Sequence, residues 1–259
     1  MATNKTSVSV AETGRGPKKV YTPSPEEQSR ANTFRLTAAL LWVLALGAEA
    51  ACIFWALKQV PIVLWQVIAL LVLDAVLAIG GSLLWKRSNK LDPPSRANGL
   101  TFWLQSQLGL IVAVLAFLPL IVVVLLSGNL STKEKGIIAG VAGVLLVVTG
   151  LFGVDWNPVS AEQYNQEVAV VMAVNGENEV FWVKNGSVYH LCEESSDLQR
   201  DSADGNVYNG TVAAAHENGM QRLANRKECG YDPNNPPDVT DWLPGGGLFD
   251  QITAPQDTP

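Results

Sequence analysis

Four long stretches in the first part of the chain are almost entirely apolar. They lie at residues 34–57, 61–85, 100–126 and 136–154. A helix of about 20 apolar residues crosses the ~30 Å hydrocarbon core of a bilayer. Lipid offers the backbone no hydrogen-bond partners, so such stretches must be helical. Four of them in succession disfavour a buried soluble core and predict a four-helix transmembrane bundle over residues 34–154.

The ends of these stretches carry signals of helix starts and of membrane interfaces. Ser24, Pro25 and Glu27 form a capping pattern that predicts a first helix beginning near Pro25, outside the bilayer. The same pattern at Ser131 and Glu134 predicts the start of the fourth helix. Tryptophans favour the headgroup layer. They lie near the predicted ends at Trp55, Trp65, Trp85, Trp103 and Trp156.

The net charge of −6 averages two unlike halves. Residues 1–153 contain 13 basic and 7 acidic side chains, whereas residues 154–259 contain 5 basic and 17 acidic ones. Only 16% of all residues are charged, against about 25% in a soluble domain. The basic side chains lie beside the predicted spans, which suits an anionic lipid bilayer as partner and argues against nucleic acid.

The positions of Lys and Arg also predict an orientation. Ten of them precede the first span or follow the second, and only three lie in the other two loops. Cytoplasmic loops are enriched in these residues. This favours a multi-pass plasma-membrane protein with both termini inside. The fourth span disagrees, because Lys133 and Lys135 precede it and no basic residue follows until Lys184. A C-terminal half outside, with the fourth span failing to cross, is the alternative.

Glu49 and Asp74 lie well inside the first and second stretches. An acid within a membrane is costly to bury and is a candidate functional site. One interpretation is a proton or cation site between the helices; the other is a protonated acid that is hydrogen-bonded within the bundle. No Lys or Arg lies at similar depth, and no internal repeat typical of transporters is visible. Structural hydrogen bonding is therefore the preferred expectation.

Small residues repeat along the fourth stretch at Gly136, Gly140 and Gly143. Glycines at spacings of three and four let helix backbones approach closely. Packing within the bundle is the preferred interpretation, and homo-oligomerisation is the alternative.

Composition divides the rest of the chain. Residues 1–33 are polar and largely disordered apart from the start of the first helix, and residues 155–175 form a capped connector helix. A small α+β domain is expected over residues 176–230. Residues 231–259, which are acidic and rich in proline, are expected to be a disordered tail.

Turn and cap residues predict the elements of the small domain. Asn185-Gly186 lies between two aromatic and β-branched runs at residues 180–183 and 188–191, which is the pattern of a hairpin. A third short strand is expected at residues 206–208. Thr211 is a good cap for a following helix. A domain of this size buries little core and often needs a staple such as a disulfide or metal.

Both histidines and two of the three cysteines of the chain fall in this domain. Cys192 and Cys229 are a candidate disulfide if the domain lies in an oxidising compartment. His190, Cys192, His216 and Cys229 are together a candidate zinc site if it does not, since two thiolates and two imidazoles suit tetrahedral coordination. The spacing matches no standard zinc finger. Unlinked thiols and surface histidines are the third alternative.

The region resembles a small domain of uncharacterised actinobacterial multi-helix membrane proteins. The resemblance lies in Tyr189-His190-Leu191, in the helix start Gly210-Thr211-Val212 and in Cys229. It implies membrane helices followed by a hairpin domain with a metal-binding knuckle, and implies no particular activity. The chain departs from the family at Ser195, where the family has a cysteine, and lacks the second cysteine beside Cys229. The departure points to a Cys192–Cys229 disulfide in place of the metal.

The sequence contains no phosphate-binding loop, metalloprotease helix, nucleophile elbow or kinase signature. We therefore expect a non-enzymatic membrane scaffold or sensor without a cofactor, whose C-terminal domain binds another protein. The alternative is a small ion- or proton-coupled transport protein that uses the intramembrane acids.

Overall fold

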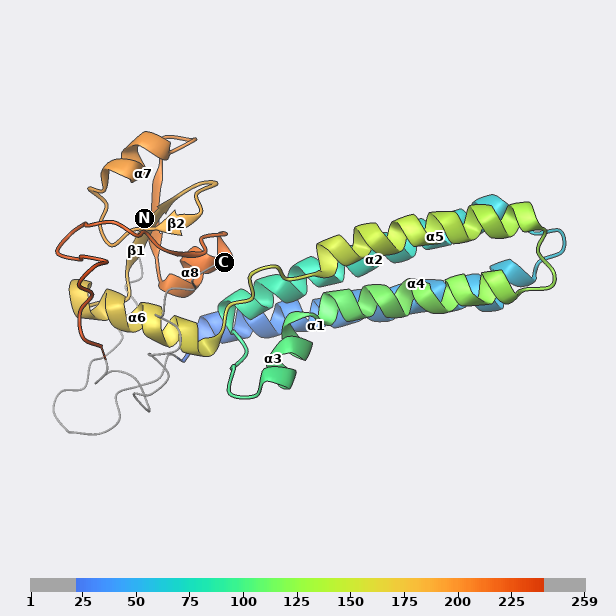
Figure 1. Cartoon of the computed structure of the whole chain (residues 1–259), viewed down its shortest axis with the longest axis horizontal. Helices are drawn as coiled ribbons and strands as arrows, with labels where there is room; N and C mark the ends of the chain where they lie inside the picture. The colour runs from blue at the N-terminus through green and yellow to red at the C-terminus, as the bar shows by residue number, and fades with distance from the viewer. Residues whose placement is uncertain (1–21, 240–259) are drawn as a thin grey trace, which may run out of the picture.

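The computed structural model describes residues 22–239 as a long helical bundle with a small domain at one end (Figure 1). The predictions for the polar N-terminal segment before residue 22, and for the acidic tail from residue 240 onward, lie outside the described residues. We call the end of the bundle that carries the small domain the proximal end, and the opposite end the distal end.

Four long helices form the bundle. They are α1 (Pro25–Phe54), α2 (Leu64–Leu91), α4 (Leu108–Leu126) and α5 (Thr132–Gly153). All four are long and apolar enough to cross a membrane, which agrees with the sequence prediction. A short 3-10 helix, η1 (Ala56–Lys58), lies in the distal turn between α1 and α2.

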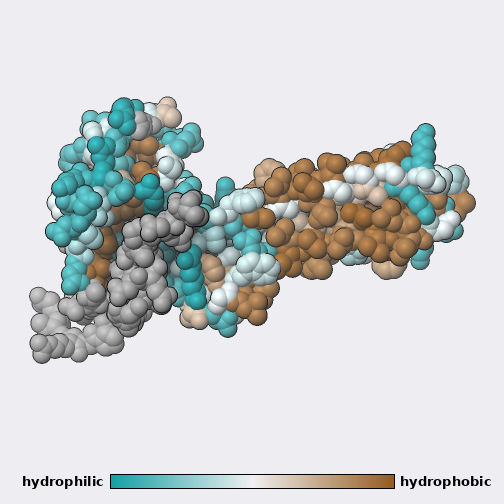
Figure 2. All heavy atoms as spheres, viewed as in Figure 1, coloured by the Kyte–Doolittle hydropathy of each residue, from teal (hydrophilic) through white to brown (hydrophobic). Residues whose placement is uncertain are grey.

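The outer surface of the bundle is apolar, as a lipid-facing surface must be. Figure 2 shows a continuous hydrophobic surface over the helices, with polar residues at the distal tip and over the small domain. Leu36, Val76 and Leu126 are among many large apolar residues that are more than half exposed. A soluble protein rarely exposes so large an apolar area.

The helix starts follow the capping signals. Ser24 and Ser131 each accept a hydrogen bond from the backbone of the third helical residue, and that residue's Glu side chain accepts one in return. The third stretch departs from the prediction of one continuous helix. It is divided into α3 (Gly99–Ser106) and α4 at Gln107, whose amide side chain exchanges two hydrogen bonds with the backbone of Asp155.

Close backbone contact within the bundle occurs at glycines other than the predicted ones. A Cβ placed on Gly153 would come within 2.7 Å of the backbone of Gly109, so α4 and α5 cross there. A Cβ on Gly136, Gly140 or Gly143 would meet nothing within 4 Å. The interpretation that these three glycines pack within the bundle is therefore wrong. Spacing alone indicates a smooth helix face but does not say what lies against it.

The connector and small domain follow α5. Their elements are α6 (Ala161–Asn175), β1 (Val180–Val183), β2 (Val188–Tyr189), α7 (Ser196–Asp201), β3 (Val207–Gly210), α8 (Val212–Glu217) and β4 (Arg222–Leu223). β1 pairs with β3 in antiparallel orientation, and β2 pairs with β4 in parallel. A bridge between Phe181 and His190 connects the two pairs.

The turn predicted at Asn185-Gly186 is present, and the Gly186 amide donates to the carbonyl of Val183 at 3.1 Å. The two flanking segments run antiparallel, but only one bridge joins them, because the ladder partner of β1 is β3. The cap predicted for α8 is confirmed, since the Thr211 hydroxyl accepts a hydrogen bond from the backbone of Ala214.

The core of the small domain lies between α6, the strands and α8. Val171, Val180, Trp182, Tyr189, Leu191, Val212, Ala215 and Met220 are its buried members. Tyr231 packs against this core and its backbone bridges to Glu228, and Val239 is buried. The prediction that disorder begins at residue 231 is therefore wrong for residues 231–239, where an aromatic ring and an apolar side chain hold the chain against the domain.

Candidate functional site

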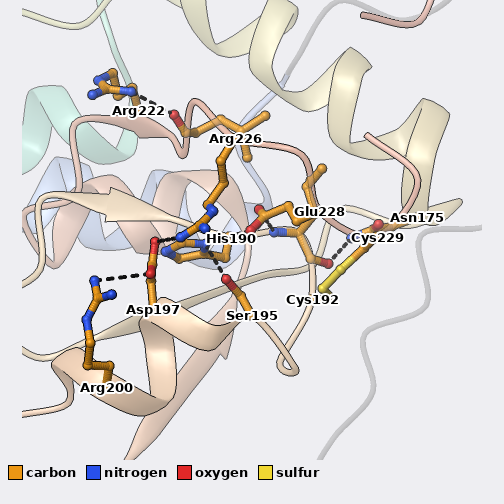
Figure 3. A network of polar contacts seen from close by, with 12 residues as sticks. Asn175, His190, Cys192, Ser195, Asp197, Arg200, Arg222, Arg226, Glu228 and Cys229 are labelled. Atoms are coloured by element: carbon orange, nitrogen blue, oxygen red, sulfur yellow. Dashed lines mark hydrogen bonds and ion pairs between the residues drawn. A yellow bond between two sulfur atoms is a disulfide. The ribbon is translucent and has the colours of Figure 1, made fainter. Parts of the chain in front are cut away.

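The first polar cluster of the small domain surrounds His190, which follows β2. Its Nδ1 lies 2.8 Å from Oε2 of Glu228 and 3.0 Å from Oγ of Ser195 (Figure 3). The other carboxylate oxygen of Glu228 accepts a hydrogen bond from the backbone of Leu191 at 2.9 Å. Both His190 and Glu228 have side chains that are about 95% buried. The cluster therefore joins β2 to the segment after β4.

The His190 cluster contains the residue types of a hydrolase triad but not its geometry. In a catalytic triad, the serine contacts one imidazole nitrogen and the carboxylate contacts the other, so that a proton passes across the ring. Here Ser195 and Glu228 both contact Nδ1 of His190. This arrangement fixes the imidazole in place. Because both side chains contact the same nitrogen, the ring does not lie between the serine and the carboxylate as it does in a triad.

A disulfide joins Cys192 to Cys229 beside this cluster, with the two Cα atoms 6.3 Å apart (Figure 3). Cys229 has a φ of 50°, and Gly230 follows it with a φ of 84°. The disulfide therefore holds the tight turn that carries Glu228 against the end of β2. Of the three alternatives left open by the sequence, the structure contains the disulfide.

The candidate zinc site is not formed. Within residues 22–239, no group of three or more His, Cys, Asp or Glu residues is placed to hold a metal ion. His190 contacts Glu228, and His216 contacts Glu167, while Cys192 and Cys229 bond to each other. The zinc interpretation is wrong because the two imidazoles pair with carboxylates and the two cysteines pair with each other, so the four side chains do not converge on one point.

The second polar cluster surrounds His216 on α8. Its Nε2 lies 2.5 Å from Oε2 of Glu167 on α6, and the same oxygen accepts a hydrogen bond from the hydroxyl of Tyr189 at 2.9 Å. The ring of Tyr164 stacks on the imidazole at 4.7 Å. Burial, followed by the charge of Glu167, raises the pKa of Tyr189 well above its usual value, so the hydroxyl stays neutral and acts as a donor.

The second cluster also forms part of the attachment to the bundle. The hydroxyl of Tyr164 donates to the backbone oxygen of Lys90, near the end of α2, at 2.5 Å. Elsewhere on this junction, Arg30 on α1 pairs with Glu217 at 2.5 Å, and the Thr211 hydroxyl donates to Glu27 at 2.9 Å. The domain is thus bonded to the first turns of α1 and the last turn of α2.

The connector adds contacts to the loop between α2 and α3. Glu162 on α6 accepts hydrogen bonds from the hydroxyl of Ser95 and from the backbone of Arg96. The pKa of Glu162 is lowered by these bonds against the opposing effect of its burial. The backbone of Ala161 donates to Pro94 at 3.1 Å. The connector is therefore attached to the loop between α2 and α3 through both side-chain and backbone hydrogen bonds.

The surface near the His190 cluster carries an exposed ion-pair network and a shallow hollow. Asp197 pairs with Arg200 at 3.1 Å and accepts a hydrogen bond from Arg226. The hydrogen bond and the charge of Arg226 hold the pKa of Asp197 below its usual value. The hollow beside this network is lined by Val188, Asp197, Arg222, Ala224, Asn225 and Arg226.

Glu49 and Asp74 are buried in the bundle, as their sequence positions predict. Asp74 is 1% exposed and Glu49 is 7% exposed. Neither oxygen of Asp74 has a hydrogen-bond partner, and Oε1 of Glu49 has none. The expectation of structural hydrogen bonding is therefore wrong for Asp74.

Sequence reasoning missed the carboxylates that pair with the histidines. Glu167 lies on the connector helix, three residues after Tyr164, and Glu228 lies directly before Cys229. The excess of acidic residues in this half of the chain was the available signal. A buried histidine needs a hydrogen-bond partner, and carboxylates are abundant in this part of the sequence. No family model, curated protein or solved structure matches the chain.

Proposed function

We propose that this protein is a non-enzymatic scaffold or sensor of the plasma membrane, in which four membrane helices present a small domain that binds another protein. One observation carries the proposal: the domain is bonded directly to α1 and α2 through Arg30, Glu27 and Tyr164. A partner bound to the domain thereby acts on the positions of the helices, and a change in the helices acts on the domain.

The hollow lined by Val188, Asp197, Arg222, Ala224, Asn225 and Arg226 is the surface we assign to the partner. It combines two exposed arginines, Arg222 and Arg226, with the apolar side chains of Val188 and Ala224, and arginine is enriched where proteins bind one another. A non-enzymatic role is supported by the geometry at His190, because Ser195 and Glu228 contact the same ring nitrogen and the imidazole therefore does not lie between them as a proton relay.

A photo-crosslinking amino acid tests this assignment in the full-length protein in its own membrane. Placed at Asn225 in the hollow, it should give a discrete crosslinked protein. Placed at the exposed Glu177, it should not. Arg222→Glu should abolish the product, whereas the matched charge reversal Lys184→Glu, in an exposed turn, should leave it. Identical products from both crosslinking positions would contradict the proposal.

We further propose that both termini are cytoplasmic. The structure supports one side for both, because α5 returns beside α4 and the small domain contacts the first turns of α1. The excess of Lys and Arg before α1 and after α2 favours the inside for that end. The disulfide favours the outside, since such bonds are rare in reducing compartments.

An impermeant maleimide applied to intact cells separates the two orientations. With the domain inside, Cys192 and Cys229 should react only when the membrane is permeabilised and a reductant opens the disulfide. Reaction in intact cells after addition of an impermeant reductant would place the domain outside. Cys52, which is buried in the bundle, should stay unreactive throughout and serves as the internal control.

A second candidate function, a small ion- or proton-coupled transport protein, is favoured by the buried acids of the bundle, whose free oxygens have no protein partner. Flux into liposomes that contain the purified protein, compared with the double variant of Glu49→Gln and Asp74→Asn, tests it. The resemblance to actinobacterial membrane proteins with a C-terminal hairpin domain, and homo-oligomerisation through α5, both stay predictions.

A further inference from the structure

Two acids from neighbouring helices lie close together in the distal half of the bundle. Glu49 is in the last two turns of α1, and Asp74 is in the third turn of α2. Nε1 of Trp42 on α1 donates a hydrogen bond to the carbonyl of Ala78 on α2 at 3.3 Å, and the two helices run antiparallel. Glu49, two turns after Trp42, therefore lies within about one turn of Asp74 along the helix axes, and Cys52 follows Glu49 by one turn. The three side chains therefore form one buried polar group between α1 and α2.

The surroundings of this group are apolar. Leu71 and Ala75 on α2, and Ala116 and Leu120 on α4, are all at most 4% exposed and belong to the distal core. These aliphatic side chains offer the two carboxylates no hydrogen-bond donor.

Three carboxylate oxygens remain without a partner: Oε1 of Glu49 and both oxygens of Asp74. An ionised carboxylate in such surroundings loses several kcal/mol of hydration without compensation. Two neighbouring carboxylates cannot both keep their charge unless a cation lies between them. A positive charge shared by the two carboxylates, from a proton or another cation, would remove most of this cost.

No basic side chain of the bundle supplies that charge. Between Leu36 and Phe54, Glu49 is the only charged residue of α1, and between Leu64 and Trp85, Asp74 is the only one of α2. α4 has none. The charges of α5 are confined to its first turns, at Lys133, Glu134 and Lys135, and Lys58 lies in η1.

The chemistry of the ligands selects the cation. Hard metal ions need six or more oxygen ligands in a defined shell, and the acids offer three free oxygens among aliphatic side chains. Within the described residues, no group of His, Cys, Asp and Glu is placed to hold a metal. A proton needs only one oxygen and is satisfied further by sharing between two carboxylates.

We propose that Glu49 and Asp74 form a proton-binding site in the membrane bundle, in which the pair carries at least one proton at neutral pH. This proposal does not depend on either proposed function of the whole protein. The site could bind a proton whether or not that proton is moved across the membrane, and whatever the small domain binds.

An apolar carbodiimide tests the site on the full-length protein in lipid nanodiscs. A carboxyl oxygen bonds to the central carbon of the reagent while the carboxyl proton moves to one of its nitrogens, which gives an O-acylisourea. Migration of the acyl group from that oxygen to a nitrogen then gives a stable N-acylurea adduct. At neutral pH we expect one adduct per chain, located by peptide mass spectrometry at Glu49 or Asp74. Labelling should fall as the pH is raised.

Matched variants separate a specific site from general reactivity. Glu49→Gln combined with Asp74→Asn should reduce labelling to background, whereas Glu26→Gln, an exposed acid in the first turn of the same helix, should leave it unchanged. Infrared difference spectra of the wild-type protein give a second measurement that needs no variant. The carbonyl band of a buried protonated carboxyl should disappear on raising the pH.

Two results would overturn the proposal. Absence of any adduct at both acids, together with absence of the infrared band at neutral pH, would show that both carboxylates are ionised. An adduct that forms only after dialysis against a chelator or into sodium-free buffer would show that a metal cation occupies the pair.

Discussion

Buried ionisable groups are compensated in the small domain and uncompensated in the bundle. His190 and His216 lie 2.8 and 2.5 Å from the carboxylates of Glu228 and Glu167. Asp74, by contrast, is 1% exposed and neither of its oxygens has a hydrogen-bond partner. Burying a polar group is costly unless it is hydrogen-bonded. The domain meets that requirement with its own residues, whereas no protein group in the bundle meets it for Asp74.

The two regions also differ in what holds them together. The small domain uses polar clusters and one disulfide around a modest core. The bundle uses close packing of helix backbones, with Gly109 and Gly153 in contact at the proximal end. Lipid provides no hydrophobic force between helices, so close packing is the expected source of stability there. Substitutions at these points should therefore act on one region and spare the other.

The largest effect is expected from Glu167→Ala. The substitution leaves Nε2 of His216 and the hydroxyl of Tyr189 buried without a partner, which should lower the unfolding free energy of the domain by about 3–5 kcal/mol. Hydrogen exchange of the β1 and β3 amides in the detergent-solubilised protein measures it. Glu177→Ala, at an exposed position on the following turn, should change the value by less than about 0.5 kcal/mol. Equal protection in the two variants would contradict the role of the cluster.

Removal of the disulfide should have the next largest effect. Cys192 and Cys229 are 37 residues apart, and a loop of that length predicts a loss of about 2–4 kcal/mol when both are changed to serine. The same exchange measurement reports it. Reductant should lower the wild-type protein to the level of the double variant and leave the variant unchanged. A reductant effect on the variant would assign the loss to something other than this bond.

In the bundle, Gly153→Ala should lower stability by about 1–3 kcal/mol, because the added methyl group meets the backbone of Gly109. Gly140→Ala is the matched control on the same helix, where a methyl group meets open space. Unfolding in mixed micelles, followed by circular dichroism, compares them. A larger loss for Gly140→Ala would instead indicate a contact between copies of the chain.

Sequence patterns were sufficient for elements whose cause is local. The capping residues Ser24, Ser131 and Thr211 each begin a helix where expected, because a cap depends on residues three positions apart. The four apolar stretches correspond to four helices because membrane spans are determined by length and hydropathy.

Long-range pairings were beyond the sequence. The partner of β1 proved to be β3, and the partners of the histidines proved to be glutamates on other elements. The same applies to Gly109 and Gly153, which contact each other across two helices although no small-residue spacing relates them. Composition lists the residues available for pairing, and only the three-dimensional arrangement selects among them.

Asp74→Asn tests the bundle side of the comparison. Since neither carboxylate oxygen has a donor in the protein, the nearly isosteric amide should change the unfolding free energy of the bundle by less than about 1 kcal/mol. The mixed-micelle measurement used for the glycine variants checks it. A loss of several kcal/mol would show that the carboxylate has a protein partner and would remove the contrast with the small domain.

The smallest effect is expected at the exposed pair of Asp197 and Arg226. The hydrogen bond from Arg226 lowers the pKa of Asp197 in the folded domain. The unfolded chain therefore binds the proton first, near the ordinary aspartate pKa of about 4. Stability from this pair is present above that pH and is lost as the pH falls through the folded value.

Asp197→Asn should consequently lower stability slightly at neutral pH and reduce the loss of stability on acidification. Arg226 is about half exposed, so salt should screen the difference between variant and wild type. Domain exchange rates across the acid range, at low and high salt, measure it. Glu193→Gln, at an exposed position of the preceding loop, controls for the change in net charge. An acid dependence that Asp197→Asn leaves intact would show that the pair of Asp197 and Arg226 does not cause it.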